Sequence, residues 1–580
     1  VIEKDNSLKL TGSTDAGQIG IVSGAGNLRI ENTKFKILSS GTFSGPTNLT
    51  ASTLTLNKAD SLGTSAVTFV ANSKVIFESP DGTSNNNNTF QGEGSLLVNG
   101  GSLTLAGKYV DLTPTFTGGL TLENATVSTD KESDYGWKRV GSGNIALNGT
   151  SSLTVYYSND QEKDSASFEN KKLSGSGTLS LVNSGTNQDS FKFGSQNNSG
   201  TFTGTLALNN VGISLDGQNA TAMGNASLKL DNQSTAAIVK EAFKTTGKVS
   251  FLAGATLDFS SVPSYLGAKE ISNTITASKG FDFSNSPQGK IKVNLSGKVG
   301  KGDAALDLPL LDQDNGPVRL YFGFGNVTGS LANIKLVDAD GNDLDLGSQT
   351  FDYKDGTAEL TYSWGLTADA SDSPLFGTSE GFGLGYKLTT VNVNKDQTLV
   401  LGPVEKGNDS TLSAKLTSSK GSDSKVEIHG ELNFDNRTNN FDSTLILTAD
   451  SSLTAVAGAL GQKSELFASE VSLEDASTLT LKDGSHTIGS LNTASSSTVV
   501  MNAATDLTIR GDSTVEGTLK GGNSLNFEGK DGSVLDVTLS SSNDQFKAPV
   551  SLKYTSLTLG EVSSLGSSTI ELGQNSTVQY

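Results

Sequence analysis

Two histidines carry the side chain that proteins most often use for acid–base catalysis. His429 and His486 each lie among polar or glycine residues, with neither a second histidine nor a carboxylate motif nearby. Serine and aspartate are abundant, so counting alone leaves a Ser/His/Asp triad open. However, the Gly-Asp-Ser-Gly elbow of a serine protease is missing, because Gly511-Asp512-Ser513 continues into threonine. We therefore expect both histidines to be surface residues and the chain not to be an enzyme.

The run from Asp338 to Asp343 comes nearest to a metal-binding motif. Its Asp-x-Asp-x-Asn spacing resembles the start of a calcium loop, but Gly341 occupies the fourth place and no glutamate closes the loop. A hairpin turn explains the run better than calcium binding, which stays the alternative. We expect neither a metal nor a cofactor.

An integrin-type tripeptide, Arg510-Gly511-Asp512, is the first of two candidate partner-binding motifs. It lies between Leu507-Thr508-Ile509 and Val515-Glu516-Gly517, where a strand protein needs a corner. Gly-Asp is an ordinary corner pair. A turn is therefore the favoured interpretation, and receptor binding is the alternative.

The second candidate is the aromatic and basic cluster of Tyr135, Gly136, Trp137, Lys138 and Arg139. Aromatic faces beside cations can stack on sugars or pair with a partner's aromatic residues. The competing interpretation is a loop whose tryptophan folds back onto the protein.

The elements that must position these residues are predicted from composition and periodicity. Glycine is frequent and only 34% of residues are apolar, which can signal disorder. Yet Leu, Val and Ile alternate with polar residues in short clusters along nearly the whole chain, as in Leu54-Thr55-Leu56 and Leu479-Thr480-Leu481. Helical periodicity is confined to Thr235 to Lys244 and Ala455 to Phe467. A stacked repeat of short strands is therefore expected, and such a core need not divide into several domains.

The charge and the absence of cysteine limit the functional class. A net charge of -19 argues against nucleic acid and anionic membranes as partners. With no cysteine there is no disulfide, thiolate metal site or cysteine nucleophile, which suits export through an oxidising periplasm. Because the chain has neither a signal-peptide start nor a membrane-length apolar run, we expect the export signal and the anchor to lie outside this sequence.

Two signatures alternate along the chain. The first is Gly-x-Gly-x-aliphatic-x-aliphatic, as in Gly175-Ser176-Gly177-Thr178-Leu179-Ser180-Leu181. The second is a phenylalanine followed by a strand, as in Phe202-Thr203-Gly204-Thr205-Leu206-Ala207-Leu208. Corners of a three-sided coil need Gly or Asn for positive φ, and phenylalanine fills the wide part of its core.

This ordered alternation resembles the passenger-associated repeat of autotransporters, and within them the AIDA-type self-associating adhesins. The resemblance covers about 1–305 and 400–580, and its specific part is the recurrence of both motifs in order. It implies a right-handed, single-stranded parallel β-helix on the bacterial cell surface. It also implies that the protein is anchored in the outer membrane by a barrel that lies outside this sequence, or that it is released into the medium.

Between 306 and 398 the composition changes, and aromatic residues become more frequent. Two motifs typical of type I′ turns also occur here, Asp340-Gly341-Asn342 and Asp355-Gly356. We predict a β-hairpin subdomain here that interrupts an all-β protein. The expected divisions are a β-helix at 1–305, the insertion at 306–398 and a second β-helix at 399–580.

The expected function is that of an autotransporter passenger adhesin, which mediates bacterial self-association, aggregation and biofilm formation as a virulence-type surface protein. Its partner would be the same protein on a neighbouring cell, paired through the least acidic lateral face. The alternatives are a host adhesin for an extracellular-matrix protein or glycan, a purely structural stalk, and a β-helix enzyme that degrades polysaccharide.

Overall fold

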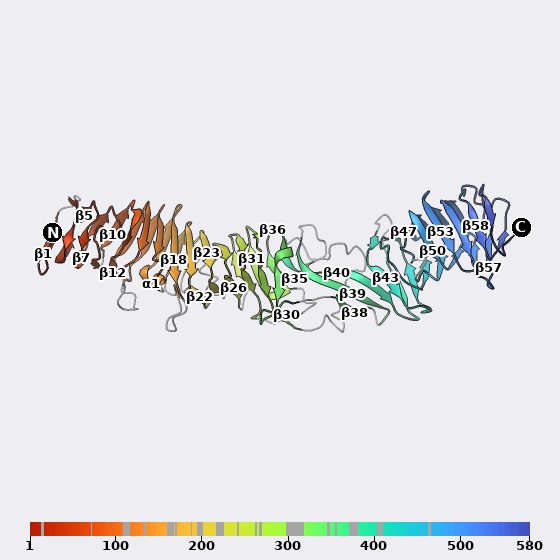
Figure 1. Cartoon of the computed structure of the whole chain (residues 1–580), viewed down its shortest axis with the longest axis horizontal. Coiled ribbons are helices and arrows are strands. Elements are labelled where there is room, and N and C mark those ends of the chain that lie inside the picture. Colours follow the sequence, from red (N-terminus) through yellow and green to blue (C-terminus); the bar gives the residue numbers. More distant parts are fainter. Residues whose placement is uncertain are drawn as a thin grey trace. The chain divides into compact units, whose positions relative to one another are not determined.

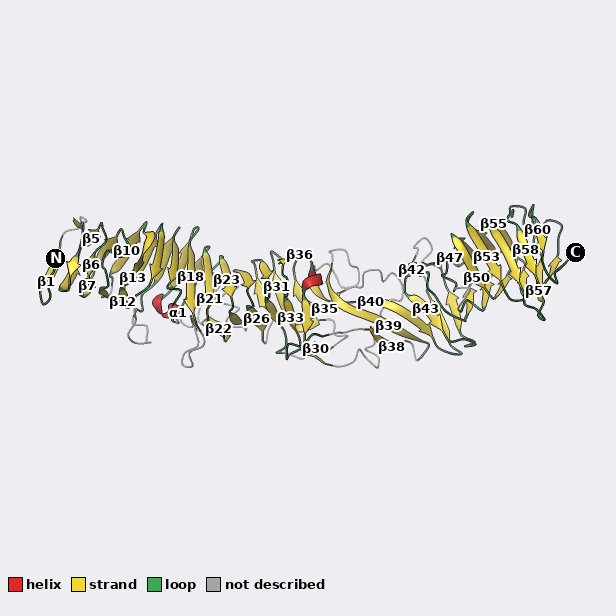
Figure 2. Ribbon diagram, viewed as in Figure 1, coloured by secondary structure: helices red, strands yellow, loops and turns green. Residues whose placement is uncertain are grey.

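The computed structural model describes the chain except for residues 13–16, 71, 108–115, 133–134, 159–166, 169–170, 187, 189, 194–200, 216–224, 240–242, 262–263, 266–269, 297–317, 345–347, 354–355, 370–380, 403–409 and 462–465. The described part consists of short strands, with one four-residue α-helix, α1 (Gly136–Arg139), and one 3-10 turn, η1 (Leu331–Asn333) (Figure 2).

The alternating apolar residues form the predicted strands. In β18 (Ser152–Tyr157), for example, Leu153, Val155 and Tyr157 are buried while the residues between them remain partly accessible. A strand turns successive side chains to opposite faces, so period-2 alternation places one set in the core.

Strands of successive turns pair in parallel and in register, which makes a β-solenoid of about 21 turns in all (Figure 1). On one side, Leu103, Val127, Leu153 and Leu179 come from four consecutive turns, occupy equivalent positions and are each at most 1% exposed. Each such side chain contributes roughly 1.5–3 kcal/mol by burial. The predicted all-β, parallel β-helix fold is thus confirmed.

The chain divides into two compact units. The first comprises Val1–Gly297, Val318–Asp345 and Leu366–Leu384, and the second comprises Lys298–Pro317, Leu346–Gly365 and Gly385–Tyr580.

The first unit contains a ten-stranded parallel sheet and an eight-stranded one. The eight-stranded sheet runs from β2 (Gly17–Ile19) to β20 (Leu173–Gly175). In order, the strands of the ten-stranded sheet are β11 (Asp81–Asn86), β14 (Ser102–Leu105), β16 (Thr126–Thr129), β18, β21 (Thr178–Asn183), β23 (Thr205–Asn209), β25 (Ser227–Asp231), β28 (Val249–Leu252), β32 (Phe281–Asn285) and β36 (Val327–Gly329).

The second unit has three parallel sheets. One runs from β41 (Thr398–Leu401) to β61 (Thr577–Gln579), and a second from β42 (Ser410–Leu412) to β55 (Thr518–Gly521). The third consists of β50 (Gly484–Ile488), β53 (Thr505–Ile509), β56 (Ser524–Glu528), β58 (Val550–Lys553) and β60 (Ile570–Leu572). This third sheet begins only at β50, because the preceding turns have corner loops on that side.

The region predicted as a hairpin insertion contains both parallel solenoid strands and an antiparallel hairpin. Its start continues the first solenoid, since β36 and β37 (Lys335–Val337) pair in parallel with strands of the preceding turn. The hairpin follows, with β38 (Ser348–Tyr353) antiparallel to β39 (Ala358–Asp369). The long β40 (Gly381–Val393) then leads into the second unit, where it pairs in parallel with β43 (Lys415–Ser418).

The phenylalanines of the second signature fill the core as predicted. Phe43, Phe116 and Phe202 are at most 1% exposed. Phe116 lies 5.5 Å from the ring of Phe69 and 6.2 Å from that of Phe90, so aromatic rings of different turns pack against one another at tilted angles.

Both glycines of the first signature allow close approach between turns, and the first also adopts a special backbone conformation. Gly175 has a φ of 94°, the left-handed conformation expected at a corner, and a Cβ there would overlap the carbonyl oxygen of Leu147. At Gly143 a Cβ would overlap the carbonyl oxygen of Gly118 in the preceding turn. The second glycine is therefore needed for close approach alone.

The two expected helices are wrong as far as the structure describes them. Thr235–Ile238 is strand β26, and Ser452–Val456 is strand β47 followed by a turn. Ala236 and Ile238 are both buried, so the residues follow period 2 rather than 3.6. Residues 240–242 and 462–465 lie outside the described part.

Candidate functional site

The aromatic and basic cluster forms helix α1 rather than the expected loop. Tyr135 is its N-cap, and Lys138 Nζ lies 5.1 Å from the centre of the Tyr135 ring and 4.9 Å from that of Trp137. Lys138 is only 5% exposed, and Trp137 is half-buried. The lysine is thus held against the rings of its own cluster, and its cation is largely withdrawn from solvent.

Arg139 is also held by its surroundings. Its Nη1 donates to the carbonyl oxygen of Leu105 at 3.0 Å and lies 3.7 Å from Asp130 Oδ2. With both cations engaged inside the fold, the cluster stabilises this corner. Its role in binding a partner stays a prediction.

Lys171, which the sequence did not single out, is buried beside this cluster. Its Nζ lies 4.2 Å from the centre of the Phe168 ring and 3.4 Å from the carbonyl oxygen of Trp137. Burial lowers the pKa of Lys171 to about 7. The local pattern did not reveal this, because one of the two contacts, with Trp137, joins residues 34 positions apart.

Arg510, Gly511 and Asp512 form the corner between β53 and β54 (Ser513–Val515), as the favoured interpretation predicted. The guanidinium of Arg510 donates to Glu528 Oε2 at 3.1 Å and lies 5.8 Å from the centre of the Phe467 ring. Asp512 is exposed and accepts from the backbone N–H of Asp536 at 2.9 Å. The arginine is thus committed to contacts within the protein, and receptor binding by this tripeptide stays a prediction.

The prediction that both histidines lie on the surface is wrong for His486. His429 is partly exposed and lies 3.6 Å from Glu427, whereas His486 is 1% exposed, with Nε2 3.1 Å from the carbonyl oxygen of Lys482. In β50, Ser485 and Thr487 point outward, so the alternation of the strand turns His486 inward. Desolvation lowers its pKa.

The turn at Asp338 is present, but it is not of the predicted type I′. Asp338 accepts from the backbone N–H groups of Asp340 and Asn342 and from the side-chain amide of Asn342, at 2.8 to 3.0 Å. The side-chain amide is the main reason why the pKa of Asp338 is lowered. A type I′ turn needs positive φ at two residues, and in this turn Gly341 alone has it. Asp355 of the second turn lies outside the described residues.

One lateral surface of the first unit stands out by its lack of charge. Strands β14, β16, β18, β21 and β23 contain no Asp, Glu, Lys or Arg. Most of their outward positions carry hydroxyl groups, which form two rows in register across consecutive turns until Ala207 interrupts the second row on β23. We call this surface the hydroxyl face, and its members are Ser102, Thr104, Thr126, Ser128, Ser152, Thr154, Thr178, Ser180 and Thr205.

Hydroxyls of neighbouring turns on this face contact one another. Thr104 Oγ1 lies 3.2 Å from Ser128 Oγ, and Ser152 Oγ donates to Thr126 Oγ1 at 3.4 Å. Asp81 on β11 borders it on one side, and Lys229 and Asp231 on β25 border it on the other. The sequence predicted pairing through the least acidic lateral face, but only the strand register shows which strands form an uncharged one.

Neither a metal-ligand cluster nor a membrane-length helix is present among the described residues. No group of three or more His, Cys, Asp or Glu side chains in this part is arranged to hold a metal ion. None of its helices has the length and apolar character that a membrane span requires.

Comparisons with known proteins give a distant relative. The chain is 26% identical over 446 residues, or 75% of its length, to YuaQ, an uncharacterized protein of Escherichia coli (strain K12). The chain spans 30% of the length of this curated relative. No family model matches the chain, and no solved structure matches it either.

Proposed function

We propose that this chain is the adhesive, surface-displayed passenger of a bacterial autotransporter, and that it mediates self-association through the hydroxyl face. The observation that carries the proposal is an uncharged lateral surface over five strands in a chain of net charge -19. Two such chains repel each other, and contact through an uncharged surface keeps their charges furthest apart.

The chemistry of this face suits a second copy of itself. Each hydroxyl can both donate and accept a hydrogen bond, so identical surfaces are complementary without any matching of charge. Neighbouring turns repeat at ~4.8 Å in every copy, so hydrogen bonds can form in register along the contact. An antiparallel pair has two-fold symmetry, in which every contact occurs twice.

The size of the face implies a weak individual contact. Five strands at ~4.8 Å with two outward rows cover only a few hundred Å², well below the ~800 Å² per partner of a typical stable complex. Each hydrogen bond would add only ~0.5–1.5 kcal/mol. Cell–cell adhesion would therefore depend on many copies acting together on facing surfaces.

The parallel solenoid, the absence of cysteine and the alternating glycine and phenylalanine signatures support surface display. We propose no enzymatic activity, because His486 points into the core rather than toward solvent and His429 has only a neighbouring glutamate.

The test is aggregation of a non-adhesive bacterial strain that displays this chain. The triple variant Thr126→Asp, Thr154→Asp and Ser180→Asp places three like charges on the hydroxyl face, and we expect it to abolish settling of the cells. The matched control, Thr454→Asp, Thr480→Asp and Thr498→Asp, adds the same charge to outward positions of the second unit and should settle like the parent. Equal settling of the two triple variants, or no aggregation by the parent, would refute self-association through this face.

A further inference from the structure

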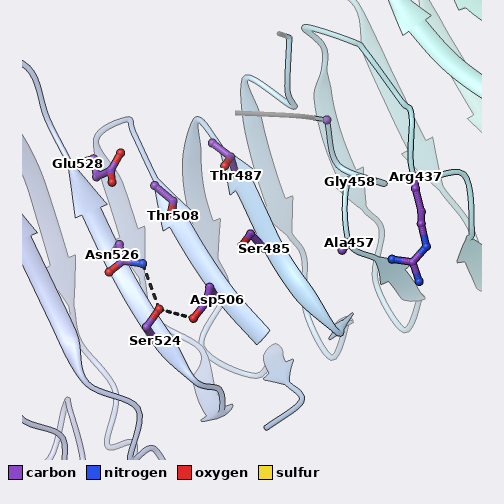
Figure 3. Close-up of a pocket in the computed structure, with 11 residues that line it drawn as sticks. Arg437, Ala457, Gly458, Ser485, Thr487, Asp506, Thr508, Ser524, Asn526 and Glu528 are labelled. Atoms are coloured by element: carbon purple, nitrogen blue, oxygen red, sulfur yellow. Dashed lines mark hydrogen bonds between the residues drawn. The ribbon is translucent and has the colours of Figure 1, made fainter. Parts of the chain in front are cut away.

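The second unit has a polar groove at the place where its third sheet begins. The floor consists of the outward faces of β50, β53 and β56, and the wall contains Arg437 and the corner around Gly458 (Figure 3). Its volume is about 560 Å³, within the range of ligand sites in proteins. We call this the polar groove.

Six floor residues form two rows that follow the strand register. Ser485, Asp506 and Ser524 make up one row. Thr487, Thr508 and Asn526 make up the other. Groups within a row are ~4.8 Å apart and the rows are separated by two residues of strand, ~6.6 Å. The floor is thus a grid of hydrogen-bonding groups over three turns.

Two of these groups lie at the bottom of the groove and make no hydrogen bond within the described residues. Thr487 is 4% exposed and Thr508 is 8% exposed, yet neither hydroxyl oxygen is cut off from solvent. Because both hydroxyls face the groove without a bond inside the protein, each is available to donate a hydrogen bond to a ligand or to accept one from it.

The charges in and around the polar groove are nearly balanced. Arg437 donates to Asp483 at 2.9 Å, and Arg510 pairs with Glu528 at the far end. Asp506 accepts from the side chains of Asn523 and Ser524 at 2.8 and 2.5 Å, which fixes the carboxylate as an acceptor. Since no excess of positive charge is present, sulfated or phosphorylated ligands are disfavoured.

We propose that the polar groove binds a neutral oligosaccharide that runs across β50, β53 and β56. A sugar chain offers hydroxyls that donate and accept, which matches the threonine, asparagine and aspartate groups of the floor. The spacing of the turns, ~4.8 Å, is comparable with the length of one pyranose ring, so successive sugars can meet successive strands in the same way.

The carboxylates of the groove favour binding over cleavage. Asp506 aligns with Ser524, and Glu528 lies four residues further along β56, so the two backbone positions are ~14 Å apart. The carboxyl groups of glycosidases are separated by ~5–10 Å. The ligand would therefore be held intact. Because the groove belongs to the second unit, this site is independent of the hydroxyl face.

The test is calorimetric titration of the purified chain with neutral hexasaccharides of glucose and of N-acetylglucosamine, with a heparin hexasaccharide as the anionic comparison. We expect at least one neutral hexasaccharide to bind and heparin to bind more weakly. The variant Thr487→Val with Thr508→Val removes the two hydroxyls at nearly constant volume and should weaken binding at least tenfold.

Two further variants make the result specific. Thr454→Val with Thr480→Val changes two aligned outward threonines on another sheet and should leave affinity unchanged. Ser485→Trp places a large side chain at an exposed position of the floor and should block binding without altering the core. The proposal is overturned if no neutral hexasaccharide binds at millimolar concentration, if heparin binds more tightly, or if binding survives the paired valine change or Ser485→Trp.

Discussion

The hydroxyl face and the polar groove are built from the same kind of residue on the same kind of strand, yet they differ in what surrounds them. On the hydroxyl face, Thr104 and Ser128 contact each other across neighbouring turns and remain partly accessible. In the groove, Thr487 and Thr508 lie beside a wall and are nearly buried. The corner loops of adjacent turns, rather than the strand sequence, thus decide whether outward hydroxyls stay on an open lateral surface or line a walled groove.

The substitution with the largest expected effect disrupts the stacking of turns that aligns the hydroxyl face. Gly143→Ala brings a Cβ onto the carbonyl oxygen of Gly118, a backbone atom that cannot rotate away. We expect a loss of about 3 kcal/mol in the free energy of unfolding of the first unit, the upper part of the range for overpacking. Denaturation followed by circular dichroism measures it. Gly20→Ala, where a Cβ meets nothing within 4 Å, is the control, and an equal loss in both would contradict the role of close stacking.

The buried Lys171 gives the next largest effect and a dependence on pH. Its pKa is about 7 in the folded protein and 10.5 when unfolded, so below pH 7 both states carry the proton and the folded state bears the full cost of a buried charge. Between pH 7 and 10.5 only the unfolded state binds the proton, and stability therefore rises with pH.

The variant Lys171→Met removes the cost of burying the charged lysine in the folded protein. We expect the variant to be more stable than the parent by a few kcal/mol at pH 6, with the difference shrinking toward pH 10. Denaturation of the two proteins at both pH values tests this. A difference that does not change with pH would mean that Lys171 keeps its charge in the folded protein.

A matched pair of threonines sharpens the comparison of the two regions. Thr129, at the end of β16, is fully buried and its Oγ1 accepts from the backbone N–H of Tyr156 at 2.9 Å. Thr129→Val leaves that N–H without a partner and should cost about 1–3 kcal/mol. Thr508→Val removes a hydroxyl that has no partner in the described protein, and should change stability by less than ~0.5 kcal/mol. Thermal unfolding distinguishes the two, and an equal cost would show that Thr508 is already satisfied.

The smallest expected effect is a change of stability with pH that depends on His486, which is buried behind the groove floor. Burial lowers its pKa below 6.5, so in the window between the folded pKa and 6.5 only the unfolded state is protonated. The second unit should therefore lose stability as the pH falls below 6.5, and His486→Leu should reduce this loss. Denaturation of parent and variant at pH 7 and pH 5 provides the measurement, and parallel losses in both would exclude the histidine as the cause.

The sequence was sufficient for those features that depend on neighbours along the chain. Alternating residues predicted the strands, the recurring phenylalanines predicted the core, and Asn124 and Asn210 have the positive φ expected at corners. Features that depend on other turns were missed. His486 follows a serine and precedes a threonine, so nothing local marks it as buried, and the wall of the groove comes from Arg437, some fifty residues before β50.

The alignment of the hydroxyl rows has a consequence for how such a chain can change in length. Ser128, Thr154 and Ser180 occupy the same row at successive intervals of 26 residues. Duplication or loss of one complete interval would keep every later side chain on its own side, whereas a change of a single residue within a strand would exchange inside and outside. The permitted genetic step is thus a whole turn, and recombination between similar turns would lengthen or shorten both hydroxyl rows in increments of one turn without redesign of the core.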